Sequence, residues 1–175
     1  MNSFEDLENL RVDLSALPDE DAYKWAETYY LKNFIGRNGR SGIQKAHDGE
    51  DVTFFNDRCF HAFRTSHDRA RHPYSKKKVA KDRIERINWI QLIIEGDVVD
   101  VECWEVPLKV PEEGYRNFPG KRLYVYWQAK YIVWLEPLKK GGFKFSSSYV
   151  LPEKEIRRYI TRGRKIWCSS PDQQA

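Results

Sequence analysis

Histidine and arginine residues lie close together in the second quarter of the chain. His61 is part of the apolar run CFHAF, and Arg64 and His67 follow it. An imidazole, whose reference pKa is about 6.5, can take or give a proton near neutral pH, and a guanidinium can neutralise a phosphate. Together such groups could cleave RNA without a metal ion, by deprotonating the 2′-hydroxyl, protonating the leaving oxygen and stabilising the phosphorane. A histidine that is only hydrogen-bonded in the core is the alternative interpretation.

A second group of polar side chains lies in the segment FKFSSSYVL at 143–151. Alternation along a strand predicts one face made of Phe143, Phe145, Ser147 and Tyr149. We therefore expect Ser147 and Tyr149 to share a face, where their hydroxyls could bind or protonate a phosphate oxygen. A strand whose small residues only pack under a helix is the alternative.

Positive charge is concentrated in two blocks of the chain. From Arg58 to Arg86 ten lysines and arginines face three acids, and from Lys139 to Lys165 nine face two, whereas the formal net charge of the whole chain is only +4. Two such blocks in one domain are a plausible footprint for phosphates, and a merely solvated basic surface is the alternative. The residues that we expect to contact nucleic acid are Arg64, His67, Arg71, Lys76, Lys77, Lys78 and Arg83.

Patterns for metals and cofactors are weak. The chain has no Cys-x-x-Cys and no His-Glu-x-x-His, and His61, His67 and His72 could bind zinc only through an unusual loop. Three glycines between Gly36 and Gly42 are not followed by the Lys-Ser/Thr pair of a phosphate-binding loop. We expect neither a metal nor a cofactor.

The elements that must position these residues follow from periodicity. Helical spacing predicts a helix over about 20–33, and the segment 79–95 (VAKDRIERINWIQLIIE) is the clearest helix, ended by Gly96. Residues 52–55 read as a short strand, or as the lead into a short helix at 59–63, and 67–78 as an exposed basic loop. Strands are predicted at 99–106, 123–127, 131–135 and 143–151, and a last helix runs from Pro152 to near Gly163. Helices followed by a run of strands indicate an α+β fold.

Composition and length indicate one globular domain. The 175 residues are 41% hydrophobic and 14% aromatic, which is too apolar for disorder. No apolar run approaches the roughly 20 residues of a membrane helix, and the three widely spaced cysteines suggest reduced thiols. We therefore expect a cytoplasmic protein without a membrane partner. Residues 1–18 are acidic, with four acids against Arg11 alone, and suggest a loosely held arm.

Several short motifs occur in the order found in one nuclease superfamily. They are HAF at 61–63, a basic loop, RIERINWI at 83–90, RLYVYW at 122–127, YIVWLEP at 131–137 and FSSSY at 145–149. In these motifs the chain resembles the barnase–EndoU–colicin–RelE superfamily, in its phage-associated and toxin-like branch, over residues 52–160. The resemblance implies helices packed on one face of a four-stranded antiparallel sheet, and metal-independent RNA cleavage. The positions carried over are His61, Arg83, Arg86, Arg122, Ser147 and Tyr149, with Ser147 standing where many relatives have threonine.

These observations lead to one prediction and two alternatives. The prediction is a toxin-like or phage-defence ribonuclease in which His61 is the general acid or base, Arg86 and Arg122 hold the phosphate, and Ser147 and Tyr149 supply hydroxyls. A non-catalytic nucleic-acid-binding or regulatory module with the same basic face is the first alternative, and a protein that docks an acidic partner is the second. Expected partners are RNA and an antitoxin or other acidic protein. The expected organisation is an acidic arm (1–18), a helical extension and turn (19–51), the nuclease-like domain with N-terminal helices, a four-stranded antiparallel sheet and a C-terminal helix (52–165), and a tail (166–175).

Overall fold

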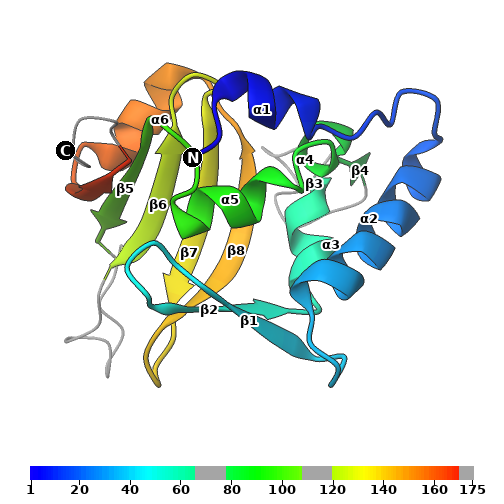
Figure 1. Ribbon diagram of the computed structural model, residues 1–175, viewed down its shortest axis with the longest axis horizontal. Coiled ribbons are helices and arrows are strands. Elements are labelled where there is room, and N and C mark those ends of the chain that lie inside the picture. The colour runs from blue at the N-terminus through cyan, green and yellow to red at the C-terminus, as the bar shows by residue number, and fades with distance from the viewer. Residues whose placement is uncertain (66–77, 108–119, 170–175) are drawn as a thin grey trace, which may run out of the picture.

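The computed structural model describes residues 1–65, 78–107 and 120–169. Its centre is a seven-stranded sheet with the strand order β1-β2-β8-β7-β6-β5-β9 (Figure 1). The strands are β1 (Ser41–Lys45), β2 (Asp51–Phe55), β5 (Val101–Val106), β6 (Lys121–Tyr126), β7 (Tyr131–Pro137), β8 (Phe143–Val150) and β9 (Arg164–Cys168). A separate two-stranded ribbon joins β3 (Arg64–Thr65) to β4 (Lys78–Val79).

The prediction of a four-stranded antiparallel sheet is wrong, although the α+β class agrees with the structure. Strands β5 to β8 do form an antiparallel meander, but β2 adds to β8 in parallel and brings β1 with it. At the other edge, β9 pairs with β5, so residues predicted as the end of the domain and a tail form an edge strand. The sheet is therefore mixed, because the pairing of β2 with β8 is parallel whereas β1 with β2 and β9 with β5 pair antiparallel.

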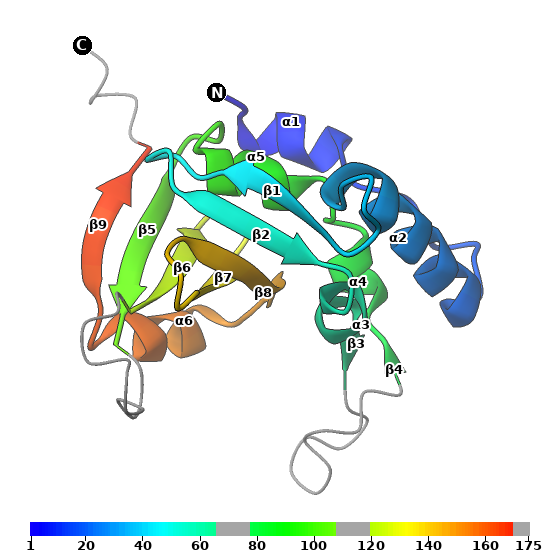
Figure 2. The same ribbon diagram turned by 90° about the horizontal axis from the view of Figure 1, so that it is seen from below.

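Helices cover both faces of the sheet (Figures 1 and 2). Helices α1 (Phe4–Asn9) and α5 (Trp89–Glu95) lie on one face, and α6 (Glu153–Ile160) lies on the other. Helices α2 (Asp19–Phe34), α3 (Arg58–Phe63) and α4 (Lys81–Ile84) stand at the side where β8 runs. The larger core fills the space between the sheet and α1 to α5, and a smaller one, centred on Ile156, lies under α6. Among the described residues, no helix has both the length and the apolar character needed to cross a bilayer.

The N-terminal segment packs into the larger core, unlike the loose arm that its acidic sequence suggests. Leu7 and Leu14 are buried, and the indole Nε1 of Trp89 donates a hydrogen bond of 2.7 Å to the Leu7 carbonyl. Arg11 extends the attachment with a 2.6 Å ion pair to Glu85. Glu5, Asp6 and Asp13 are exposed, so the buried leucines determine where the segment lies.

The helix predicted over 79–95 is interrupted. Residues 85–88 make turns closed by bonds from residue i+3 to residue i, such as Ile87 N to Ile84 O at 3.0 Å, between α4 and α5. Ile84, Ile87 and Ile90 are all fully buried, and tighter turns of about three residues align side chains that are three residues apart. The predicted stop is confirmed, because Gly96 caps α5 in the left-handed conformation with φ 79°.

Candidate functional site

The second half of β8 lies beside α3 and α4 instead of beside a long strand. The parallel pairing with β2 involves only Phe143 and Lys144, at the beginning of β8. Beyond them, β8 packs against α3 and α4, the two short helices that carry His61 and Arg83. Three of the sequence-predicted site residues, Arg83, Ser147 and Tyr149, are therefore brought into one region by the way the sheet ends.

A β-bulge decides which face the β8 side chains occupy. Trp134 pairs with Ser147 and Leu135 with Phe145, so Ser146 is an extra residue. Side chains after the bulge therefore change faces relative to those before it. Phe145 lies in the larger core, whereas Tyr149 packs against the smaller core on the opposite face. The expectation that Ser147 and Tyr149 share a face is met, but the face is not the one that holds Phe143 and Phe145.

Ser147 and Tyr149 both line a cavity of about 390 Å³. Sequence reasoning did not identify its other walls. They come from β5 and the residue after it, from β6, β7 and α6, and from the bulge, namely Val106, Pro107, Lys121, Trp134, Glu136, Tyr159 and Ser146. The sequence signals for these walls are the aromatic residues Trp134 in YIVWLEP and Tyr159 in EKEIRRYI. Both segments also fit the pattern of an ordinary core strand or helix, so the aromatic residues did not stand out.

Arg83 connects α4, α3 and β8. Its Nη1 donates a hydrogen bond of 3.0 Å to the carbonyl of Ala62, in the last turn of α3. Its guanidinium carbon lies 4.7 Å from the centre of the Tyr149 ring, within the range of a cation–π contact. His61 precedes Ala62 and is exposed. Arg83 thus places a fixed positive charge between the helix that carries His61 and the strand that carries the hydroxyl groups.

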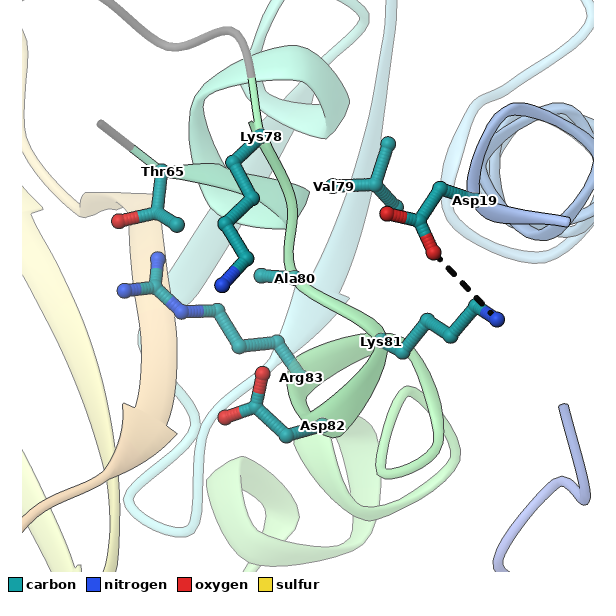
Figure 3. Close-up of a pocket in the computed structure, with 8 residues that line it drawn as sticks. All are labelled: Asp19, Thr65, Lys78, Val79, Ala80, Lys81, Asp82 and Arg83. Atoms are coloured by element: carbon teal, nitrogen blue, oxygen red, sulfur yellow. Dashed lines mark ion pairs between the residues drawn. The ribbon is translucent and has the colours of Figure 1, made fainter. Parts of the chain in front are cut away.

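Arg83 also lines a second cavity, of about 370 Å³ (Figure 3). The hydroxyl of Thr65 and the side chains of Lys78 and Arg83 point toward one another in it, whereas Lys81 turns away to an ion pair of 3.4 Å with Asp19. Two cations and a hydroxyl around one space are donors suited to a phosphate. Because Tyr149 lines the first cavity and contacts Arg83, the two cavities adjoin.

Two predicted phosphate ligands, Arg64 and Arg86, are engaged in contacts within the protein. Arg64 makes two hydrogen bonds to Glu20, at 3.2 and 2.7 Å, and stacks on Tyr23 of α2 at 4.1 Å; the bonds to Glu20 raise its pKa. Arg86 donates to the Asp82 carbonyl at 2.6 Å and lies over the ring of Trp89. The contacts of Arg64 therefore tie β3 to α2, and those of Arg86 link α4 with α5.

Arg122 lies apart from Ser147 and Tyr149. It is 9% exposed, and its two terminal nitrogens bind Asp48 at 3.1 and 2.6 Å. It also stacks on Phe143 at 4.1 Å, which puts it on the face of the larger core, opposite Tyr149. The structure therefore does not bring Arg122 to the hydroxyl groups with which the resemblance associates it.

Of the basic loop predicted at 67–78, only Lys78 lies within the residues that the structure describes. Lys78 is exposed at the beginning of β4, where it lines the second cavity. His67, Arg71, Lys76 and Lys77 lie outside the described residues, as does His72.

A pair of buried hydroxyl groups lies under the same region. Tyr131 on β7 and Ser148 on β8 are fully buried, and neither hydroxyl has a hydrogen bond of good geometry within the described part of the chain. Burial raises the pKa of Tyr131, against the opposing effects of the Ser148 hydroxyl and of the charges on Arg86 and Arg83. The charges of Arg83 and Arg86 are therefore close enough to act on the hydroxyl of Tyr131, the first residue of β7.

Comparisons of the chain with protein-family models, with curated proteins and with solved structures found no match.

Proposed function

We propose that the protein is a metal-independent ribonuclease whose reacting phosphate binds beside the second half of β8. The observation that carries this proposal is the contact of Arg83 with the ring of Tyr149, 4.7 Å away, between a cavity that holds Lys78 and one that holds Ser147. A guanidinium next to two hydroxyl groups and an ammonium can hold a phosphodiester and stabilise the additional negative charge of its transition state.

The reaction would be an internal transfer. The 2′-oxygen forms a bond to phosphorus and loses its proton to a base, while the bond from phosphorus to the 5′-oxygen breaks and that oxygen receives a proton. The products are a 2′,3′-cyclic phosphate and a 5′-hydroxyl. His61 is the residue assigned to proton transfer, Arg83 and Lys78 neutralise the nonbridging oxygens, and Tyr149 with Ser147 donate hydrogen bonds or a proton.

Support for His61 comes from its position. It is exposed on the last turn of α3, a turn whose Ala62 carbonyl is held by Arg83. The apolar neighbours Cys59 and Phe63 are buried, so the helix that carries the imidazole is held in place while the ring itself reaches solvent. A general acid or base needs both properties.

A non-catalytic RNA-binding module remains a second candidate, and one observation favours it. Arg64, Arg86 and Arg122, all expected at phosphates, are engaged within the protein. Under this proposal the same basic region binds RNA and an acidic protein such as an antitoxin covers it. For either function we propose a cytoplasmic location, which the buried, reduced thiols of Cys59 and Cys103 support.

The test compares cleavage of labelled single-stranded RNAs by wild type and by two variants in the presence of a chelator. His61→Ala should reduce the rate by roughly 10²–10⁴, the usual contribution of a general acid or base. Tyr149→Phe keeps the ring under Arg83 and removes only the hydroxyl, so a loss of rate would identify that hydroxyl. Tyr29→Phe makes the same chemical change on α2, where Tyr29 stacks on Trp25, and is the matched control.

The products separate the two candidates. A cyclic phosphate end, together with resistance of a substrate that has 2′-deoxyribose at the cleaved position, supports the ribonuclease. If micromolar protein leaves the RNAs uncleaved but binds them in a salt-dependent manner, the result refutes the ribonuclease and supports the non-catalytic binding module. Full activity of His61→Ala refutes the role given to His61 and leaves the remainder of the site to be tested by Tyr149→Phe.

A further inference from the structure

The tip of the hairpin between β1 and β2, residues 46–50, reaches the opposite edge of the sheet (Figure 2). In the strand order, β1 and β2 lie at one edge and β9 lies at the other. The ring of His47 in the tip nevertheless stacks on the ring of Trp167 in β9, with ring centres 4.2 Å apart and planes at 28°. Between these edges, Asp48 of the tip is bound by both terminal nitrogens of Arg122 on β6. The hairpin tip therefore attaches the edge strand β9 to the rest of the fold.

The ring of His47 is held from several elements. Its Nδ1 lies 2.8 Å from the hydroxyl of Tyr124 on β6, and the backbone N–H of His47 donates a bond of 2.9 Å to the carbonyl of Ile94 in α5. Gly96 packs so closely that a Cβ atom there would lie 2.9 Å from atoms of both His47 and Trp167. The stacked pair of rings thus fills the space between β6, β9 and the turn after α5.

The contact with Tyr124 favours a neutral imidazole. Burial raises the pKa of Tyr124, so its hydroxyl keeps its proton and can donate to Nδ1. A protonated imidazole carries a hydrogen on both nitrogens, so Nδ1 no longer accepts this bond. Burial also lowers the pKa of His47; the charge of Asp48 opposes this effect and the charge of Arg122 adds to it. Protonation therefore weakens the arrangement that holds the ring against Trp167.

We propose that protonation of His47 releases Trp167 and loosens β9, so that this edge of the sheet opens in mildly acidic solution. The sign follows from linkage. A histidine whose pKa is lowered by folding stabilises the folded arrangement fully above its unfolded pKa of about 6.5, and this stability is lost as the pH falls toward the folded pKa. The proposal does not depend on the proposed ribonuclease activity, because none of these residues belongs to that site.

The other contacts of β9 persist over the same pH range. On the face that bears α6, burial acts to raise the pKa of Glu102, but hydrogen bonds from Lys165 and from two indoles outweigh burial and lower it. A bond from Arg164 and one from a backbone amide lower the pKa of Glu105. Both carboxylates therefore keep their ion pairs with β9 when His47 becomes charged.

The elements packed against the ring bring three further ionisable groups. Cys103 of β5 lies opposite Trp167, and burial raises the pKa of its thiol to about 12. Of the two acids that flank Gly96, Glu95 accepts a bond of 2.8 Å within α5 and Asp97 pairs with the N-terminal amine at 3.2 Å. Among all these groups, an imidazole is the type that ordinarily changes charge near pH 6.

Hydrogen exchange of the full chain, followed by NMR, is the test. The amides of β9 and the amide of Ser169, which donates to the Val101 carbonyl at 2.9 Å, report the opening of this edge. Between about pH 7.5 and pH 5 their protection factors should fall by more than about twofold, and by up to tenfold for each unit by which the titration of the His47 ring places its pKa below 6.5. The amides of β7, in the interior of the sheet, should keep their protection factors and serve as the internal reference.

Two variants assign the response to one ring. His47→Gln removes the titrating group and keeps an amide that can bond to the Tyr124 hydroxyl, so the protection of β9 should not depend on pH over this range. His61→Gln makes the same change at an exposed position on α3 and is the matched control. In that variant β9 should respond to pH as it does in the wild type.

Wild-type β9 protection that does not change with pH overturns the proposal, as does a loss in acid that persists in His47→Gln. If His47→Gln does not fold, titration of the wild type decides. The indole N–H signal of Trp167 should shift with the same midpoint as the His47 ring, and a different midpoint or a His47 pKa at or above about 6.5 also overturns the proposal. RNA cleavage is not a readout, so the proposed function stands or falls separately.

Discussion

Replacement of Arg122 by glutamine tests whether this arginine holds the fold together or binds phosphate. The side chain is 11% exposed and makes two charge-assisted bonds to Asp48, which is 35% exposed. Breaking a fully buried pair costs about 3–5 kcal/mol, but water can reach Asp48 and recover part of that cost. The lost contact with Phe143, 4.1 Å away, adds about 0.5–1 kcal/mol. The expected loss in the free energy of unfolding is therefore about 2–3 kcal/mol.

Thermal unfolding, followed by circular dichroism at pH 7, is the assay. At about 2–4 °C per kcal/mol for a chain of this size, the Tm should fall by about 4–12 °C. Arg157→Gln is the control, because Arg157 pairs with Glu153 on the exposed surface of α6 and should change stability by less than about 0.5 kcal/mol.

The dependence on pH gives an independent check through Asp48→Asn. Burial acts to raise the pKa of Asp48, but the hydrogen bonds from Arg122 and from the Glu50 amide, together with the charges of Arg122 and His47, outweigh burial and hold the pKa below the ordinary 3.8. A carboxyl group whose pKa is lowered by folding stabilises the native state above its unfolded pKa, and this stability is lost as the pH falls through the folded pKa. Wild type should therefore exceed Asp48→Asn in stability at pH 7, and the difference should shrink below about pH 4. An Arg122→Gln protein with wild-type Tm and weakened RNA binding would refute this reasoning and make Arg122 a phosphate ligand.

Three further predictions concern the core and the basic region. Leu7→Ala should lower the free energy of unfolding in urea by about 2–5 kcal/mol, because Leu7 is fully buried; a change below about 1 kcal/mol would mean that the N-terminal segment is loosely held after all. Tyr131→Phe should be neutral or stabilising by up to about 1 kcal/mol in the same assay, since its buried hydroxyl has no well-formed hydrogen bond among the described residues, and a clear loss would reveal a partner for it. Lys78→Ala should reduce the slope of log K against log salt for single-stranded RNA by about one, and an unchanged slope would place the phosphates away from the second cavity.

Local patterns in the sequence predicted most of the elements but not their assembly. Apolar alternation placed β5 to β8 within a few residues of their observed ends, and the helix over 20–33 became α2 at Asp19–Phe34. Gly96 ended its helix as predicted, because a left-handed cap depends on the residue itself. The segment 52–55, predicted as a strand or as the lead into a helix at 59–63, is part of strand β2. A helix, α3, does follow it at Arg58–Phe63.

The sequence alone determined the supply of chemical groups, namely the basic blocks, His61, the hydroxyl groups of β8 and the tryptophans and tyrosines. Tertiary structure decided which of them meet. Composition does not distinguish Arg83 from Arg122, yet Arg83 contacts Tyr149, whereas Arg122 is buried and pairs with Asp48, 74 residues away in the chain. A single extra residue, Ser146, moved the hydroxyl groups of Ser147 and Tyr149 away from the face of Phe145. The physical reason is that periodicity reports one strand or helix at a time, whereas ion pairs, bulges and parallel strand pairing depend on partners that are distant in sequence and adjacent only in the folded chain.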